Sequence, residues 1–317
     1  MPPLKIDTHQ HVFPPLLKKA IEGNPKLSQG FIGPEWSPST TLEFMTRNDI
    51  GTSILSCAIP LNMICQNDTN ETAALTRAVN DYLASLRDQY LKQFGFFAAL
   101  PSPEDATRCI EEIRYALGTL KADGVTFFTS YNGKYLGHPD FQPVWAELNS
   151  HAAIVFTHPT MEGMEKSITD PFVIPRALID WSHETTRTAV HLIMTNTLRR
   201  FAACRVILSH GGGTLPFVAS RIADIEIQTR LSGKSPGEFL EDAKSFYYDV
   251  ALVGSTPPLQ LLRDFAPPDH LLYGSDYPFV REHAVVQKWQ AVGDEDLVRS
   301  TRKTAQTLFP RLADPVD

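Results

Sequence analysis

Eight short apolar runs are spaced along the whole chain, and longer segments with helical spacing of their apolar residues lie between them. Each run has about four to seven residues, is rich in β-branched and aromatic side chains, and does not alternate with polar residues. Such runs are typical of strands buried on both faces, as in a parallel sheet. The runs are Leu4–Asp7, Thr52–Ala58, Phe94–Ala99, Gly124–Thr129, Ala153–Thr157, Arg205–Ser209, Phe246–Ala251 and His270–Gly274.

Eight strands that alternate with helices predict the α/β class and a (β/α)8 TIM barrel. The 317 residues contain no repeat and no Gly/Ser linker, so we expect one domain over residues 1–317. The predicted helices are Thr69–Lys92, Pro103–Leu120, Pro139–Ser150, Leu178–Phe201, Gly213–Leu231, Pro258–Phe265 and Glu282–Leu308.

Two segments interrupt this rhythm and are predicted as long loops, at about residues 12–38 and 161–180. Pro14–Pro38 is rich in proline and glycine and follows the first strand, and Met161–Asp180 follows the fifth. Loops that follow the strands lie at the carboxyl-terminal face of such a barrel, where active sites form.

Composition excludes several kinds of partner. The net charge is −7 and no run of five basic residues occurs, which argues against nucleic acid and anionic membranes. No stretch has the ~20 apolar residues of a membrane helix, and the first eleven residues have no apolar signal core. The four cysteines show no C-x-x-C spacing, so we expect reduced thiols in a cytoplasmic protein.

Polar residues gather where four of the predicted strands end. The first ends in His9 and His11, the fifth in His158, the sixth in His210, and the eighth in Asp276. Residues two apart in an extended segment point to the same side, so His9 and His11 can share one target. A closed barrel brings all these strand ends onto one rim. Imidazole and carboxylate ligands suit a divalent ion such as Zn²⁺ or Mn²⁺.

Each element of this pattern has a simpler explanation when taken alone. An H-x-H pair occurs by chance in a chain with ten histidines, and Asp276 could cap the helix that follows it. Gly211–Gly213 could be only a tight turn. Their joint position at the strand ends favours a metal site. The remaining histidines are interpreted as structural or solvated: His138, His151, His183, His191, His270 and His283.

These motifs resemble the amidohydrolase superfamily, in particular its decarboxylase branch, typified by aminocarboxymuconate semialdehyde decarboxylase. The likeness covers nearly the whole chain. The motifs that carry it are Ile6–His11, Glu184–Thr186, His210–Phe217 with Ser220–Ile222, Phe246–Asp249 and Gly274–Phe279.

The resemblance implies a set of site residues. His210 is implied as an acid/base group beside the metal, Phe279 as a border of the substrate, and Arg221 as a residue that reaches into a neighbouring subunit, which implies a homodimer. No lysine is placed to be carbamylated as a bridging ligand, which favours a single ion, Zn²⁺ or Mn²⁺. The implied metal ligands are His9, His11, His158 and Asp276.

The chain departs from the semialdehyde decarboxylase at two places. The stretch Phe31–Ser39 lacks that enzyme's substrate-binding arginine, and Pro171–His183 differs in length. The chain is more similar to small fungal 6-methylsalicylate decarboxylases, so a small aromatic carboxylic acid is the expected substrate. Trp36 and Trp181 could equally be loop-packing residues. The side chains expected to suit a flat ring are Phe13, Phe31, Trp36, Trp181 and Phe279.

The expected reaction converts 6-methylsalicylate to m-cresol and CO2. Direct loss of CO2 would leave a poor aryl carbanion, so the ring carbon must first be protonated, with His210 or Asp276 as the acid. The alternative is a metal-dependent hydrolase of a lactone, amide or ester that uses the same residues. A scaffold without catalytic activity is disfavoured because all five polar positions are present.

Overall fold

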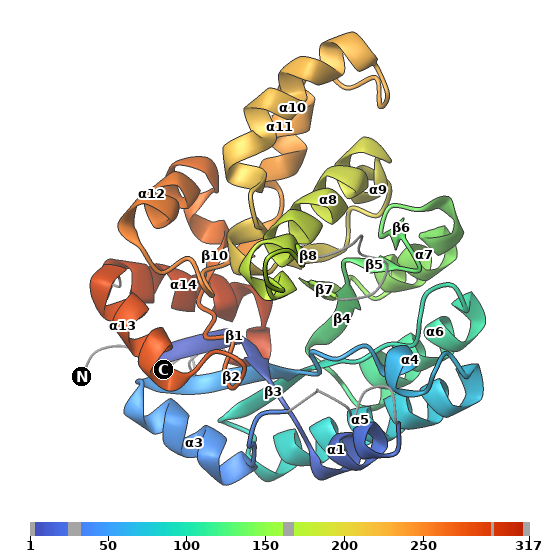
Figure 1. Cartoon of the computed structure of the whole chain (residues 1–317), viewed down its shortest axis with the longest axis vertical. Helices are drawn as coiled ribbons and strands as arrows, with labels where there is room; N and C mark the ends of the chain where they lie inside the picture. Colours follow the sequence, from blue (N-terminus) through green and yellow to red (C-terminus); the bar gives the residue numbers. More distant parts are fainter. Residues whose placement is uncertain (1–3, 25–32, 161–167, 293–294, 313–317) are drawn as a thin grey trace.

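The computed structural model describes residues 4–24, 33–160, 168–292 and 295–312 and confirms the single-domain (β/α)8 barrel (Figure 1). Each strand of the main sheet is parallel to its neighbour. A bridge between Asp7 and Tyr273 brings the last strand back to the first. The order along the barrel is β1 (Lys5–His11), β2 (Ile50–Ser56), β3 (Phe94–Ala98), β4 (Gly124–Phe128), β7 (Ile154–His158), β8 (Arg205–Leu208), β9 (Tyr247–Asp249) and β10 (Leu271–Leu272).

Helices surround the barrel, and all eight predicted strands lie where the apolar runs place them (Figure 1). Strands β5 (Ser130–Tyr131) and β6 (Lys134–Tyr135) form a small separate hairpin. The helices are α1 (Pro15–Glu22), α3 (Pro38–Arg47), α4 (Leu61–Ile64), α5 (Thr69–Gln89), α6 (Ala106–Ile113), α7 (Gln142–Ser150), α8 (Asp180–Met194), α9 (Thr197–Arg200), α10 (Leu215–Thr229), α11 (Pro236–Lys244), α12 (Thr256–Phe265), α13 (Glu282–Val292) and α14 (Glu295–Leu308).

The structure corrects several predicted boundaries. The segment predicted as a loop at Pro14–Pro38 contains helix α1, because Leu17 and Ile21 lie four residues apart and both are buried. Proline favours rather than prevents a helix at its first position, as α1 and α3 show. The predicted helix Leu178–Phe201 is divided into α8 and α9 by Asn196, whose φ of 60° is left-handed.

The second predicted loop is described only in part. Residues 161–167 lie outside the described residues, and so does Phe31 in the first loop. Of the segment predicted as irregular, residues 168–175 contain no helix or strand, a short 3₁₀ turn covers Arg176–Leu178, and α8 begins at Asp180.

The interior of the barrel is filled by apolar side chains below the rim. Phe97 stacks on Phe156 with their ring centroids 5.3 Å apart, and Phe309, which follows α14, packs against Phe97. The His9 ring lies edge-on to Phe156, with centroids 4.9 Å apart. The carboxyl-terminal rim therefore rests on a packed apolar layer. The buried residues of this layer are Ile6, Ile54, Phe97, Ile154, Phe156, Ile207, Leu272, Ala305 and Phe309.

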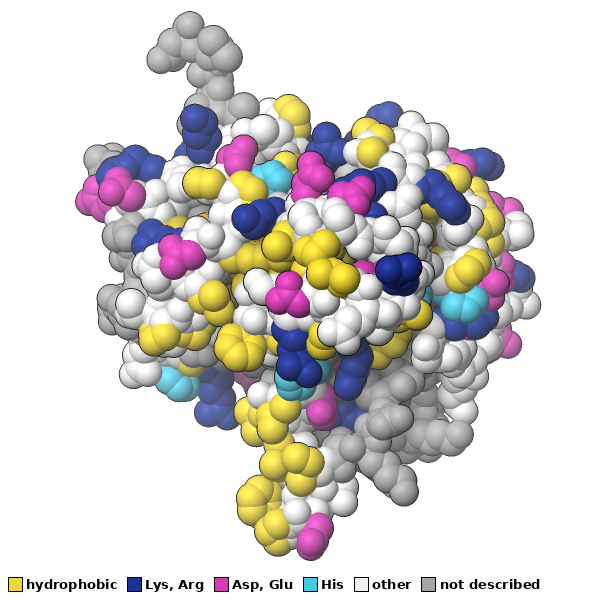
Figure 2. Space-filling model, turned by 90° about the horizontal axis from the view of Figure 1, so that it is seen from above, with side chains coloured by type: hydrophobic (Ala, Val, Ile, Leu, Met, Phe, Trp, Pro, Cys, Tyr) yellow, Lys and Arg dark blue, Asp and Glu magenta, His cyan; other side chains and the backbone are white. Residues whose placement is uncertain are grey.

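Surface charge agrees with the composition. On the face shown in Figure 2, basic and acidic side chains are interspersed, with hydrophobic side chains between them. Within the described ranges, no helix is both long and apolar enough to cross a membrane. The four cysteines are free thiols, as predicted.

Candidate metal centre and active site

The carboxyl-terminal end of strand β1 directs the imidazole rings of His9 and His11 toward the same point. His9 and His11 are fully buried, and their Nε2 atoms lie 3.1 Å apart. This is the geometry expected from two residues on the same side of an extended strand. Sequence spacing therefore sufficed to predict that the two rings converge.

His158 and Asp276 complete the cluster from across the barrel. His158 is the last residue of β7, and Asp276 follows β10 with a left-handed φ of 59°. Asp276 Oδ1 lies 3.0 Å from His11 Nε2 and 3.4 Å from His9 Nε2. One ligand atom from each of the four residues lies within 4.8 Å of the others, and all four residues are buried. Three imidazole nitrogens and one carboxylate oxygen are a fitting donor set for one divalent ion.

The Nδ1 atom of each of the three histidines already has a partner. His9 Nδ1 pairs with Asp249 Oδ2 at 2.9 Å, and His11 Nδ1 with Ser56 Oγ at 2.9 Å. His158 Nδ1 donates to the carbonyl oxygen of Pro159 at 2.9 Å. Partners at Nδ1 fix the ring orientation and leave the other nitrogen free for a metal, as is usual in protein metal sites. This arrangement supports a metal centre independently of the ligand types.

Electrostatics hold three of the four side chains in the form that a cation requires. Burial lowers the pKa of His158 well below its ordinary value, and burial likewise lowers that of His11. Burial alone would raise the pKa of Asp276, but the charge of His9 and hydrogen bonds from His11 and His210 keep it well below its usual range. For His9, burial is outweighed by Asp249 and Asp276, which raise its pKa to about 10.

His210 stands beside the four ligands on a turn of unusual backbone. Its Nε2 lies 3.3 Å from Asp276 Oδ2, the carboxylate oxygen that does not face His9 and His11. His210 has a φ of 55°, and the three glycines after it are also left-handed. At Gly213 a Cβ atom would collide with the carbonyl oxygen of Ser182 on α8, so only glycine allows this close approach. The glycine run therefore has a steric role here.

An apolar cavity opens onto His158 and Asp276 of this cluster. Phe279 lies edge-on to His11 at a centroid distance of 5.5 Å, and Trp181 to His158 at 6.1 Å. Asp276 is the one charged side chain among the described lining residues. The cavity is lined by Ile21, Ala58, Ile59, Pro60, Met63, His158, Pro159, Thr160, Trp181, Asp276 and Phe279.

Other predicted substrate residues lie outside this lining. Phe13 is buried in the outer core, and Trp36 packs against Tyr82 of α5 with centroids 6.3 Å apart. Arg221 is exposed on α10, away from the lining of the cavity in this single chain. Phe279 and Trp181 therefore line the cavity. Phe13 and Trp36 instead pack against other side chains outside the cavity lining.

Sequence reasoning assigned no role to four residues of the site. Ile21 and Met63 lie on α1 and α4, in segments not expected to be helical. Ser56 and Asp249 each stand at the end of a strand, so the argument that singled out His158 would also have found them. Asp249 was noted only as part of a motif, without a role.

A closed parallel barrel with three histidines and an aspartate converging at its carboxyl-terminal rim defines a metal-dependent enzyme of the TIM-barrel class. Comparison with known proteins gives the family. The amidohydrolase family profile matches residues 6–311, and the chain belongs to this family.

Two curated relatives match along nearly their whole length. Decarboxylase macB of Penicillium terrestre is 41% identical over 322 residues, covering 97% of this chain and 95% of the relative. The 6-methylsalicylic acid decarboxylase of Penicillium expansum is 36% identical over 321 residues, covering 99% and 98%. These relatives therefore confirm the resemblance to the decarboxylase branch of the amidohydrolase superfamily.

Solved structures share the fold. A crystal structure described as an amidohydrolase II has a TM-score of 0.86 and 31% identity, covering 96% of this chain and 99% of the other. A dihydroxybenzoic acid decarboxylase from Polaromonas sp. JS666, solved with bound manganese and the inhibitor 2-nitroresorcinol, has a TM-score of 0.78 and 19% identity. It covers 98% of both chains.

Proposed function

We propose that the protein is a metal-dependent, non-oxidative decarboxylase of a small aromatic ortho-hydroxy acid, with 6-methylsalicylate as the substrate and m-cresol and CO2 as the products. The observation that carries the proposal is the apolar cavity beside His158 and Asp276. Among its described lining residues there is no lysine or arginine, so the cation that offsets a substrate carboxylate must come from the metal centre. The relatives from Penicillium support the reaction type.

The flat cavity walls orient the aromatic ring. Phe279 and Trp181 line the cavity with aromatic rings, and Ile21 and Met63 suit an apolar ring substituent such as a methyl group. A divalent ion bound by the four ligands would neutralise and orient the carboxylate and the phenol oxygen. The ring carbon that bears the carboxylate accepts a proton, and CO2 leaves as the ring regains aromaticity.

The proton is supplied by the His210–Asp276 pair. Both are nearly buried, and Nε2 of one lies 3.3 Å from Oδ2 of the other, so a proton on the imidazole has a direct path to the substrate side of the cluster. Asp276 faces the cavity, and His210 faces a second hollow that shares Trp181 with it. This hollow gives the imidazole a route to solvent for regaining its proton.

We propose that each chain binds one divalent ion, which is either Zn²⁺ or Mn²⁺. Three nitrogens and one carboxylate oxygen suit either ion. Manganese is supported by the structural relative solved with that ion.

Solvent isotope labelling distinguishes this reaction from hydrolysis. In D2O, metal-loaded protein should yield m-cresol with one deuterium at the carbon that carried the carboxylate. A panel of lactones, amides and esters should give no product. Turnover of an ester or lactone, without CO2 release from any hydroxybenzoate, would instead establish the hydrolase alternative.

The working unit is proposed to be a homodimer. Helix α10 carries the exposed Arg221, and large apolar side chains on or next to α10 are also exposed, including Phe217 at 78% and Leu231 at 79%. Large apolar side chains that are exposed close together commonly mark a protein–protein interface. Sedimentation velocity should give a particle with twice the mass of one chain. The substitution Phe217→Asp should shift the measured mass towards that of the monomer.

A cytoplasmic location is also proposed, because four free thiols suit a reducing compartment. Fractionation of cells that express a tagged chain should recover it in the cytosolic fraction.

A further inference from the structure

Asp249 is a buried carboxylate that lies behind the metal centre. It is the last residue of β9, has no exposed surface, and does not line the substrate cavity. An ionised carboxylate in such a place is costly unless each oxygen has a partner. The hydrogen-bond partners of its two carboxylate oxygens therefore indicate the role of Asp249.

The two carboxylate oxygens serve two different parts of the site. Oδ2 lies 2.9 Å from Nδ1 of His9, the ligand at the centre of the cluster. Oδ1 accepts the backbone N–H of His210 at 3.1 Å and that of Ala251 at 3.0 Å. One side chain thus connects a metal ligand on β1 to the acid/base histidine on the turn after β8.

The contact with His9 has a chemical consequence. A carboxylate only accepts, so it requires the proton of a neutral His9 to lie on Nδ1, which leaves the Nε2 lone pair free for a cation. His11 and His158 have uncharged partners at the same position, Ser56 and the Pro159 carbonyl. Asp249 is therefore the one charged group among the three Nδ1 partners.

The contact with His210 constrains the backbone. A φ of 55° is unfavourable for a residue with a side chain, and the surroundings must hold it there. The hydrogen bond from the His210 N–H to Asp249 fixes the start of the glycine turn, and with it the direction in which the imidazole leaves the strand.

We propose that Asp249 is a positioning residue with two simultaneous tasks: it sets the metal-binding tautomer of His9 and fixes the backbone of His210. The first task concerns metal binding alone, whereas the second rests on the proposed decarboxylase function. Each task has its own measurement.

The test is Asp249→Asn, which keeps the shape and exchanges one oxygen for an NH2 group. If the NH2 faces His9, it cannot accept from Nδ1, and His9 must carry its proton on the metal-facing nitrogen. If the amide turns over, the NH2 opposes the N–H groups of His210 and Ala251. Both arrangements damage one of the two tasks.

The expected result has two parts, one for each task, and the variant should show at least one of them. Competition with a chelator, without substrate, should show Zn²⁺ and Mn²⁺ affinity reduced about 10- to 100-fold. With saturating metal and 6-methylsalicylate, kcat should remain about 10- to 100-fold below wild type, because displacement of a catalytic group by about 1 Å costs this much.

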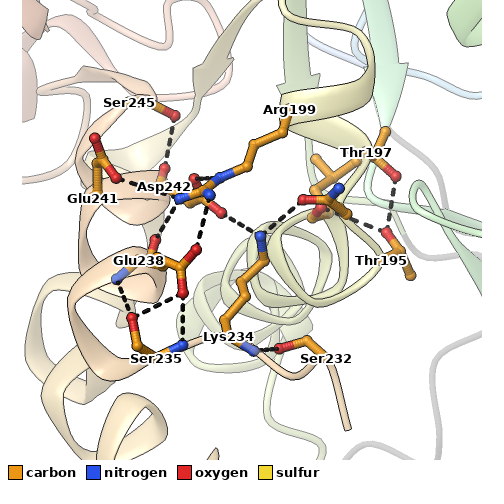
Figure 3. A network of polar contacts seen from close by, with 12 residues as sticks. Thr195, Thr197, Arg199, Ser232, Lys234, Ser235, Glu238, Glu241, Asp242 and Ser245 are labelled. Carbon is orange, nitrogen blue, oxygen red and sulfur yellow. Dashed lines mark hydrogen bonds and ion pairs between the residues drawn. The ribbon is translucent and has the colours of Figure 1, made fainter.

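The matched control is Asp242→Asn on α11. Asp242 is a buried carboxylate far from the site, paired with Arg199 at 2.7 Å and Lys234 at 2.8 Å (Figure 3). The control should lower the melting temperature of the metal-free protein and leave metal affinity unchanged. It thus separates a general loss of stability from a loss of positioning.

Wild-type metal affinity in Asp249→Asn, together with full recovery of kcat at saturating metal, would overturn the proposal, because either orientation of the amide must damage one of the two tasks. If the variant does not fold, ¹⁵N NMR of the wild-type protein loaded with zinc tests the first task. A proton on His9 Nδ1 supports it, and a deprotonated Nδ1 contradicts it. Absence of decarboxylation in wild type would refute the proposed function while leaving the affinity result valid.

Discussion

At the residue scale, the positions of the five polar site residues follow from two simple rules. Alternation along a strand predicts that His9 and His11 converge, and closure of a parallel barrel predicts that His158, His210 and Asp276 join them. The partners at Nδ1 do not follow from these rules, because they depend on register between strands. The pairing of Gln10 with Leu55 and of His11 with Ser56 is what places Ser56 beside an imidazole.

His210→Ala tests the role of the imidazole beside the cluster. Because His210 approaches Asp276 and is not one of the four converging ligands, kcat should fall by about 10²- to 10⁴-fold while metal content stays near wild type. Steady-state kinetics and elemental analysis measure the two quantities. His183→Ala, an exposed histidine on α8, should leave both unchanged. A wild-type rate in His210→Ala would remove this residue from the mechanism.

At the element scale, the strands were predictable and several helices were not. Strands buried on both faces appear in the sequence as continuous apolar runs. Helices α1 and α4 are short and carry only two or three buried residues each, so their sequences show no clear helical pattern. The apolar wall formed by Ile21 and Met63 was missed for that reason. The division between α8 and α9 depends on one left-handed residue, Asn196, which hydrophobic spacing does not reveal.

The end of helix α10 gives a prediction about pH. Glu226 accepts hydrogen bonds from the backbone and side chain of Ser232, the backbone of Gly233 and the side chain of Thr229. Although burial would raise the pKa of Glu226, these bonds lower it from 4.5 to about 2. A carboxyl group with a lowered folded-state pKa stabilises the fold above its unfolded value, and this stabilisation is lost as pH falls.

Glu226→Gln should therefore lower the free energy of unfolding most at neutral pH. Its difference from wild type should shrink as pH falls from about 4.5 towards 2. Urea unfolding of both proteins across this range, with chelator present so that metal loss does not contribute, measures the effect. A difference that does not change with pH would show that the carboxylate charge has no part in it.

At the scale of the whole molecule, the metal centre links distant parts of the barrel. The four converging side chains come from the first strand, from β7 and from the segment after β10, so a bound ion would connect distant parts of the chain across the rim. The barrel itself was predictable from the sequence because eight apolar runs are rarely compatible with another closed α/β arrangement.

Metal binding should therefore stabilise the entire fold. A ligand at 100 times its dissociation constant contributes about 2.7 kcal/mol, which corresponds to a rise in melting temperature of roughly 5 °C for a domain of this size. Calorimetry with and without Zn²⁺ or Mn²⁺ measures the shift. His11→Ala, which removes one ligand, should abolish most of it, and an equal shift in that variant would place the ion elsewhere.

The central claim, decarboxylation at a metal centre, is tested most directly with 6-methylsalicylate. Metal-loaded protein and a chelated control are incubated with the acid, and CO2 and m-cresol are followed together. We expect both products in equal amounts, and only with metal. No product from 6-methylsalicylate or other hydroxybenzoates, in protein shown to hold one ion per chain, would contradict the proposed reaction.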